Sequence, residues 1–228
     1  SKRIIQSCLN STYRKKLFRL FTDNERLRST VWCVFNSDSF DRFAININRH
    51  EWKKALEFRS YVRKEYKEKV KGLPISGGIA GSVGGGGVDP AKIYFLTKIL
   101  GPKIVVETGV SSGVSSRSFL EAMKENEVGN LHSSDLRVFL PEGKTGFMVP
   151  NELRKNWFLY SEGDEINIPL IINQVDKIDL FHYDSLKSYE EIEKTLNSLS
   201  RCFHSKTVII IDDIDRHSFF KDKHFQDS

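Results

Sequence analysis

A short apolar run that opens into a glycine- and serine-rich turn constrains the fold of this chain more than any other stretch. The run is Ile104-Val-Val106, preceded by Gly101-Pro102 and followed by Glu107-Thr-Gly109-Val-Ser-Ser-Gly113. β-Branched residues after a Gly-Pro pair predict a short buried parallel strand, and Ser118–Lys124 carries apolar residues spaced for one face of a helix. The turn therefore joins the carboxyl end of a strand to the amino end of a helix. Small residues there let a ligand approach N–H groups that have no partner within the helix.

The turn departs from the glycine fingerprint of dinucleotide-binding folds. That fingerprint is G-x-G-x-x-G, whereas this turn has only Gly109 and Gly113. Glu107 places a carboxylate at the strand tip, which suits an amino group or an ordered water better than a phosphate and favours a ligand with a cationic end. A second acidic residue, Asp135, follows where the next strand should end and present a carboxylate to ribose hydroxyls. An NAD-dependent oxidoreductase is thus disfavoured but stays an alternative.

Strands and helices alternate regularly after residue 89. The apolar spacing predicts helices over residues 90–100, 115–126, 166–174 and 188–200, and strands over residues 104–107, 130–134, 157–160, 178–183 and 207–211. This alternation predicts an α/β fold, a Rossmann-like, doubly wound, mostly parallel sheet with right-handed crossovers. The segment 136–155 carries loop signals and is expected to edge the substrate pocket.

The amino-terminal third differs from the rest in charge. Residues 1–71 hold 18 Lys/Arg and 8 Asp/Glu, whereas residues 72–228 hold 17 and 22. We expect a basic helical segment over 1–75 with helices near 1–30 and 50–71, a Gly-rich linker or lid over 76–88, and one α/β domain over 89–228. The basic face is expected to be solvated and to dock on the acidic remainder. The alternative is an RNA- or membrane-associated binding protein that uses this segment for an anionic partner.

Composition bounds the class of protein. With 228 residues, 39% of them hydrophobic, the chain suits one domain with a sizeable core and an appended segment. No run approaches the roughly 20 apolar residues of a transmembrane helix, and the amino terminus lacks a signal-peptide core, so a cytoplasmic location is expected. Cys8, Cys33 and Cys202 have no zinc or redox spacing and are expected to be free thiols.

Successive blocks along the second half of the chain resemble the class I S-adenosylmethionine-dependent methyltransferases, in a bacterial small-molecule O-methyltransferase branch. The resemblance spans roughly residues 90–220 and includes the Glu107–Gly113 turn. The later blocks, in matching order, are Leu131-His-Ser-Ser-Asp135-Leu, Phe147-Met-Val149-Pro150, Trp157-Phe-Leu-Tyr-Ser-Glu-Gly163-Asp164, Ile178-Asp-Leu-Phe-His-Tyr183-Asp184-Ser185 and Val208-Ile-Ile-Ile-Asp212-Asp213.

The resemblance implies methyl transfer from S-adenosylmethionine to a hydroxyl of a small, glycan-like or secondary-metabolite acceptor, with nucleic acid disfavoured as a partner and a homo-oligomer left open. This class usually closes its sheet with two more strands. The residues after 215 are too few and too polar for both, so we expect an abbreviated or truncated carboxyl edge.

The resemblance also implies which residues hold the cofactor. The Glu107–Gly113 turn would hold the methionine part, Asp135 the ribose diol and Gly163-Asp164 the adenine edge. For Asp164, an N-cap of the following helix is an equal alternative, and both roles are compatible. The implied cofactor-binding residues are Glu107, Thr108, Gly109, Ser111, Ser112, Gly113, Asp135, Gly163, Asp164, Tyr183, Asp184 and Ser185.

Catalysis requires that the acceptor hydroxyl lose its proton to a positioned base. Asp184 and His217 are the candidate catalytic residues, and His182 is a weaker candidate because its place on a strand suits a buried role equally well. Asp184, Asp212 and Asp213 offer hard oxygen ligands for Mg²⁺, which would lower the pKa of the acceptor. The alternative is a site without metal, in which Asp212-Asp213 caps the following turn.

Overall fold

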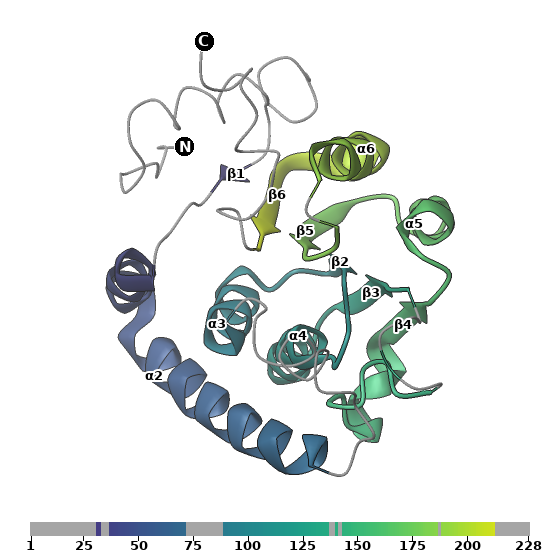
Figure 1. Ribbon diagram of the computed structural model, residues 1–228. Coiled ribbons are helices and arrows are strands. Elements are labelled where there is room, and N and C mark those ends of the chain that lie inside the picture. The colour runs from purple at the N-terminus through teal and green to yellow at the C-terminus, as the bar shows by residue number, and fades with distance from the viewer. Residues whose placement is uncertain are drawn as a thin grey trace.

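The computed structural model describes residues 31–32, 37–71, 89–136, 140, 143–186 and 188–212. Within these residues one parallel sheet forms the centre of the molecule (Figure 1). Its order is β1-β6-β5-β2-β3-β4, and every pair of neighbouring strands is parallel. The strands are β1 (Val31–Trp32), β2 (Ile104–Thr108), β3 (Asn130–Ser134), β4 (Trp157–Tyr160), β5 (Ile178–Tyr183) and β6 (Phe203–Ile211).

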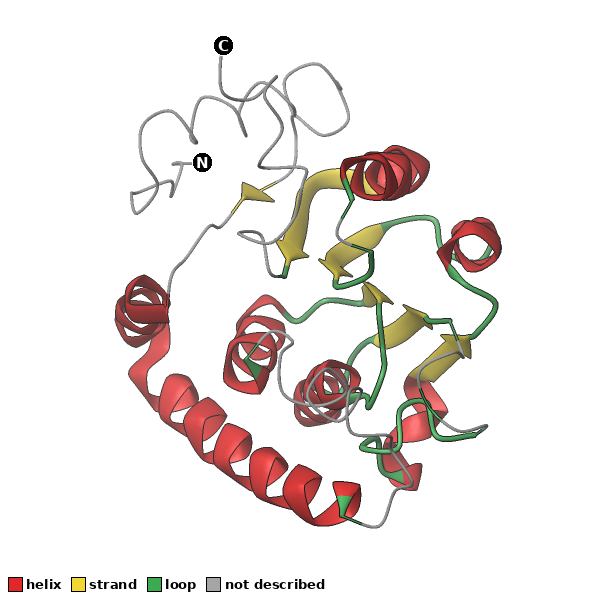
Figure 2. Ribbon diagram, viewed as in Figure 1, coloured by secondary structure: helices red, strands yellow, loops and turns green. Residues whose placement is uncertain are grey.

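Helices cover both faces of the sheet, as the doubly wound prediction requires (Figure 2). One face carries α2 (Ser37–Val70), α3 (Pro90–Leu100) and α4 (Val114–Asn126), and the other carries α5 (Asp164–Ile172) and α6 (Tyr189–Leu199). Short 3-10 helices, η2 (Asn151–Asn156) and η3 (Ser200–Cys202), precede β4 and β6. The predicted α/β Rossmann-like fold with helical amino-terminal residues is confirmed.

Alternation along the strands divides the core between the two faces. Val105 of β2 packs with Phe119 of α4 on one face, whereas its neighbour Val106 packs with Ile168 of α5 and Leu196 of α6 on the other. Because both faces are covered, β2 opens with three apolar β-branched residues in succession, Ile104–Val106, which is why this strand can be recognised in the sequence.

Most predicted elements lie where the patterns placed them. The helix over 90–100 and the strands over 130–134, 157–160 and 178–183 coincide with α3, β3, β4 and β5. Two boundaries were wrong: β6 begins at Phe203 rather than near residue 207, and α5 runs from Asp164 to Ile172. The N-cap of α5 is Gly163, so the N-cap role considered for Asp164 was wrong, and Asp164 is the first residue of the helix.

An edge strand from the amino-terminal part of the chain was not predicted. β1 pairs with β6, with Val31 beside Val208 and Trp32 beside Ile209. The helix predicted near residues 1–30 and the Gly-rich 76–88 stretch lie outside the described residues, as do Cys8 and Cys33. Cys202 is a buried free thiol, as expected.

Helix α2 crosses the outside of α3 and α4 (Figure 1). It consists of two helices joined at Asn48, whose backbone is extended (φ −157°, ψ 96°) and whose Oδ1 accepts from Glu51 N at 3.1 Å, capping the second helix. Docking on the remainder is observed at Arg59, whose Nη1 lies 2.7 Å from Asp89 Oδ2. The second helix confirms the one predicted over 50–71.

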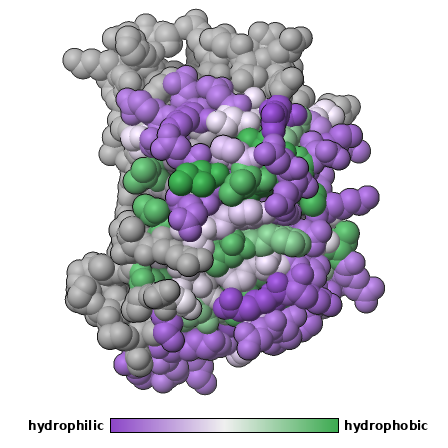
Figure 3. Space-filling view, turned by 90° about the vertical axis from the view of Figure 1, so that its right-hand side faces the viewer, coloured by the Kyte–Doolittle hydropathy of each residue, from purple (hydrophilic) through white to green (hydrophobic). Residues whose placement is uncertain are grey.

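The side of the molecule that carries β4 and α5 shows apolar side chains among hydrophilic ones (Figure 3). Exposed residues there include Phe158 of β4 and Ile166 and Leu170 of α5. Among the described residues no helix is both long and apolar enough to cross a membrane.

Candidate active site

The strand order reverses at β2, since β3 and β4 lie to one side of it and β5 and β6 to the other. In open parallel sheets ligands bind at the carboxyl ends of the strands beside such a reversal. Backbone hydrogen bonds continue one residue past each strand here: Gly109 N donates to Ser134 O, and Asp184 N donates to Thr108 O. Asp135 and Asp212 are held likewise, by Tyr160 O and Tyr183 O. The ladder thus sets Asp212, Asp184, Gly109 and Asp135 side by side along one edge.

Asp135 fastens the glycine-rich turn to the tip of β3. Its Oδ2 accepts from Val110 N at 3.0 Å and from Ser111 N at 2.5 Å, and its Oδ1 accepts from Leu136 N at 2.6 Å. The residue is 8% exposed. Burial raises the pKa of this carboxyl from its ordinary value, although the three backbone N–H groups act in the opposite direction. Asp135 therefore shapes the turn by direct contact.

Gly109 lies where the tips of β2 and β5 come together. Its φ is +79°, and a Cβ placed on it would lie 2.2 Å from the backbone oxygen of Asp184. Only glycine fits, because the residue combines a left-handed conformation with contact against backbone that has no rotamer to change. Gly113, at the other end of the turn, approaches Gly146 in the same way.

Glu107 lies beneath the turn, enclosed by the sheet and α4. Its Oε2 accepts from Ser116 Oγ at 2.6 Å and from Ser133 Oγ at 2.9 Å, and the carboxyl is 0% exposed. Its Oε1 lies 3.5 Å from Nδ1 of His182, which is fully buried. Burial lowers the pKa of His182, but the carboxylates of Glu107, Asp184 and Asp212 together outweigh it, so the net direction of the pKa is upward. The contact expected between Glu107 and a cationic ligand stays a prediction, and in this structure the polar contacts of the carboxylate are internal.

The tip of β4 is tied to the tip of β3 by a polar cluster. Ser134 Oγ donates to Asp164 Oδ1 at 2.5 Å, and Asn167 Nδ2 donates to Ser134 Oγ at 2.9 Å. Gly163 N donates to Asp135 O at 3.0 Å. Gly163 and Asp164 thus lie next to Asp135, as a shared site requires.

The tip of β5 is partly open. Asp184 and Ser185 are half-buried, whereas Tyr183 is buried in the core on the α5–α6 face and its hydroxyl donates to Leu186 O at 2.6 Å. The Tyr183 side chain thus braces the loop after β5. Asp213 and His217 lie outside the described residues. Among the residues that are described, no group of three His, Cys, Asp or Glu side chains is arranged to hold a metal ion.

Several residues around the turn were missed by the sequence patterns. Ser116 and Ser133 hold Glu107, and Trp157 Nε1 donates to Ser133 Oγ at 2.9 Å. Arg117 is buried in α4. Its burial could have been predicted from its position three residues before Leu120, on the predicted apolar face of the helix. The segment 136–155 was expected to edge the substrate pocket, and its contact with the glycine-rich turn, through Gly146 and Met148, was not predicted.

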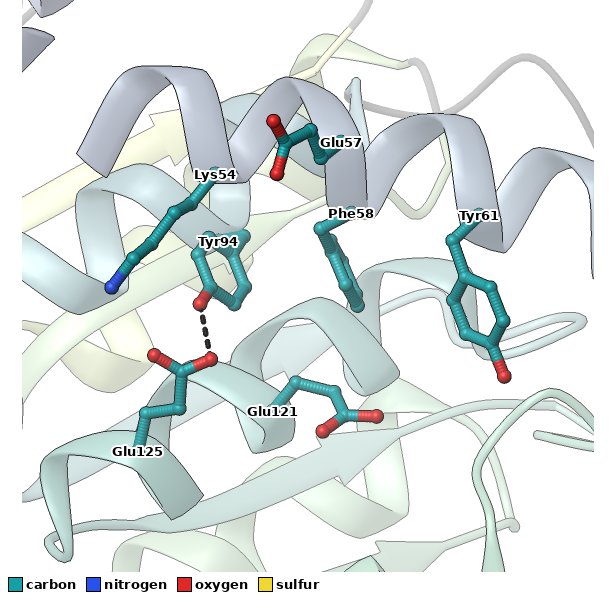
Figure 4. Close-up of a pocket in the computed structure, with 7 residues that line it drawn as sticks. All are labelled: Lys54, Glu57, Phe58, Tyr61, Tyr94, Glu121 and Glu125. Carbon is teal, nitrogen blue, oxygen red and sulfur yellow. Dashed lines mark hydrogen bonds between the residues drawn. The ribbon is translucent and has the colours of Figure 1, made fainter. Parts of the chain in front are cut away.

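A cavity of about 390 Å³ lies between α2, α3 and α4, away from the strand tips (Figure 4). Its polar groups have partners within the protein: Tyr94 donates to Glu125 at 2.5 Å, and Glu121 lies 3.6 Å from Arg117. We regard it as a seam between packed helices. Its lining residues are Lys54, Glu57, Phe58, Tyr61, Tyr94, Glu121 and Glu125.

The fold and the strand-tip geometry define a Rossmann-like domain with a candidate ligand site at the switch point of its sheet. Residues 106–214 match a family described as a methyltransferase domain, and this stretch runs from β2 to just past β6. Over these residues the chain is similar to methyltransferase domains. No curated protein sequence matches it significantly.

Solved structures with a similar shape are also methyltransferases. An S-adenosylhomocysteine-bound methyltransferase from Podospora anserina is 14% identical with a TM-score of 0.46, over 79% of this chain and 71% of that one. An O-methyltransferase from Bacillus cereus in complex with S-adenosylhomocysteine is 15% identical with a TM-score of 0.47, over 78% and 73%. TomG from Streptomyces achromogenes, an O-methyltransferase of tomaymycin synthesis, is 15% identical with a TM-score of 0.43, over 66% and 60%.

Proposed function

We propose that this protein transfers the methyl group of S-adenosylmethionine to a hydroxyl of a small glycan-like or secondary-metabolite acceptor, with the cofactor bound across the tips of β2, β3 and β4. The observation that carries the proposal is the placement of Asp135. Its carboxylate accepts from the glycine-rich turn, and its backbone oxygen accepts from Gly163 N just before α5, beside the switch point of the sheet. The match to a methyltransferase domain over residues 106–214 supports the reaction class.

The proposed cofactor position follows the strand tips in order. The turn from Gly109 to Gly113 takes the methionine part, Asp135 the ribose and Gly163-Asp164 the adenine edge. Asp135 already accepts three backbone N–H groups, but a carboxylate has about four lone-pair positions, so it retains capacity for a ribose hydroxyl. Glu107 lies under the same turn, and its contribution to a cationic ligand would be electrostatic, across the buried cluster with His182.

In the proposed reaction the acceptor oxygen attacks the methyl carbon while its proton passes to a base. Asp184 is half-buried at the tip of β5, beside Gly109, and is the candidate for that base among the described residues. Holding the oxygen and the methyl carbon in line supplies much of the rate acceleration, because orientation alone can lower the activation barrier by about 7–11 kcal/mol. His217 remains the other predicted base.

Magnesium remains a separate hypothesis within this function. Asp184 and Asp212 lie on neighbouring strand tips, and such oxygen ligands suit Mg²⁺. The third predicted ligand, Asp213, lies outside the described residues. When bound, the ion would lower the pKa of the acceptor hydroxyl.

Calorimetric titration with S-adenosylhomocysteine, S-adenosylmethionine and NAD tests the proposal. The first two are expected to bind, and NAD is not. Asp135→Asn removes a charged acceptor worth about 1.5–3 kcal/mol, so the Kd for S-adenosylhomocysteine should rise roughly 10- to 150-fold. Glu162→Gln is the matched control, since Glu162 follows β4 at the same edge but is exposed. Binding of NAD without response to the other two ligands would overturn the proposal.

The alternative of an anionic partner on the basic helix is not favoured by the described contacts. Arg59 and Arg63 of α2 both approach Asp89, and Lys69 pairs with Glu65. These cations are thus engaged with carboxylates of the protein itself.

A further inference from the structure

Arg117 is a buried cation in an unfavourable place. It is 3% exposed and lies in the fourth position of α4, near the positive end of the helix dipole. Its Nη1 lies 2.8 Å from Glu65 Oε2, its Nε lies 3.6 Å from Glu121 Oε1, and its guanidinium lies over the ring of Tyr61 at 5.3 Å. Buried ion pairs add little net stability, because the loss of hydration cancels most of the attraction. Stability is thus a weak account of why this cation is buried here.

The same network reaches the chain segment 146–148. Arg117 Nη1 donates to Met148 O at 3.4 Å, and Lys69 Nζ donates to Phe147 O at 3.4 Å. The rings of Tyr66 and Phe147 stack with centroids 6.2 Å apart. Helix α2 therefore holds this segment directly through Lys69 and Tyr66, and Arg117 of α4 links the segment to α2 through Glu65.

Segment 146–148 in turn forms a wall of the glycine-rich turn. Gly146 N donates to Ser111 O at 2.8 Å, and Met148 N donates to Ser112 O at 2.9 Å. A Cβ on Gly113 would lie 2.7 Å from Gly146 Cα, so the two backbones are in direct contact. Any outward movement of the segment would break these hydrogen bonds and leave the turn held at its start by Asp135 but without this wall.

We propose that Arg117 is a positioning residue for the cofactor turn, which it holds by fastening segment 146–148 to helix α2 through Glu65. The inference rests on the proposed function, since it takes the turn as the cofactor site. It assigns the carboxyl-terminal half of α2 a role in cofactor affinity. If the turn adopts its binding conformation for only a fraction of the time, the apparent affinity for the cofactor is reduced by that fraction.

The test compares S-adenosylhomocysteine binding between the full-length protein and a variant that carries both Arg117→Met and Glu65→Gln. Because the double change removes both charges together, neither is left buried without its partner. The urea midpoint measured in the absence of ligand should therefore stay nearly unchanged. The Kd for S-adenosylhomocysteine should rise about tenfold, the equivalent of one lost charged hydrogen bond. Amide hydrogen exchange at Gly146 and Met148 should become faster.

Two further variants complete the design. Arg63→Met removes a cation from α2, the helix of Glu65. Within the described residues Arg63 has one acidic neighbour, Asp89 at 3.8 Å, and its side chain is 58% exposed, so the Kd and the exchange of this variant should match the wild type. If the double variant does not fold, Glu65→Gln alone is measured in the same way, because the Glu65 side chain is partly exposed. Arg117→Lys retains the cation, so this variant should bind S-adenosylhomocysteine more tightly than the double variant does.

The outcomes separate this inference from the proposed function. Failure of the wild type to bind S-adenosylhomocysteine overturns the function. Wild-type binding together with unchanged Kd and unchanged exchange in the Glu65 and Arg117 variants overturns the positioning role alone.

Discussion

Replacement of Gly109 by alanine tests the close contact between the tips of β2 and β5. The added Cβ would lie 2.2 Å from Asp184 O and 2.7 Å from Asp184 C. Both are backbone atoms of the chain segment that carries the proposed base, so relief requires the two strand tips to separate. The change therefore disturbs the site and the sheet together.

Two costs add in this variant. Alanine at φ +79° costs about 1–2 kcal/mol for the left-handed conformation. Overpacking of a well-packed region costs about 1–3 kcal/mol more, which gives roughly 2–5 kcal/mol in all. For a chain of this size each kcal/mol corresponds to about 2–4 °C in Tm.

Gly101→Ala is the matched control. Gly101 also has a positive φ, +56°, but a Cβ there meets nothing within 4 Å, so only the conformational cost applies. Urea unfolding of both variants should show the larger loss for Gly109→Ala by about 1–3 kcal/mol, with weaker S-adenosylhomocysteine binding in that variant alone. Equal urea midpoints and equal ligand affinities in the two variants would refute the reasoning from backbone contact.

The remaining predictions concern pH and metal. Burial acts to raise the pKa of Glu65, but hydrogen bonds from Lys69 and Arg117 outweigh it and lower the value from 4.5 to about 2. Its contribution to stability is thus present above pH 4.5 and lost as the pH falls through about 2. Glu65→Gln should flatten the dependence of the urea midpoint on pH in that range, and parallel curves for variant and wild type would contradict this. Excess EDTA should lower turnover and added Mg²⁺ should restore it if Asp184 and Asp212 hold the ion, and undiminished turnover in EDTA would exclude the metal hypothesis.

Local patterns accounted for the elements that surround the site. Val105 and Val106 face opposite covered sides of the sheet, so β2 begins with an apolar run, and Gly101, which ends α3, precedes it by three residues. Helix α3 begins at Pro90 with Asp89 as its N-cap, a signal carried by adjacent residues. Because parallel strands end at one edge, the tips at Gly109, Asp135 and Asp184 could be grouped without coordinates.

The partners of these residues could not be grouped in that way. β1 joins β6 across more than half of the chain, and no periodicity marks a strand of two residues. Ser133 and His182 flank Glu107 because of the pairing register of β2 with β3 and β5. Register depends on how whole strands pack, and a shift of one residue would turn each of these side chains to the other face.

The amino-acid sequence alone thus determined the α/β class, the glycine-rich turn and the acidic strand tips, since these depend on residues adjacent in the chain. Only the tertiary structure decided that Asp135 grips the turn and that Arg117 meets Glu65, 52 positions away in sequence. Contacts of that kind arise when separate elements pack together and bury polar groups that must then find partners. No local pattern encodes which partner is found.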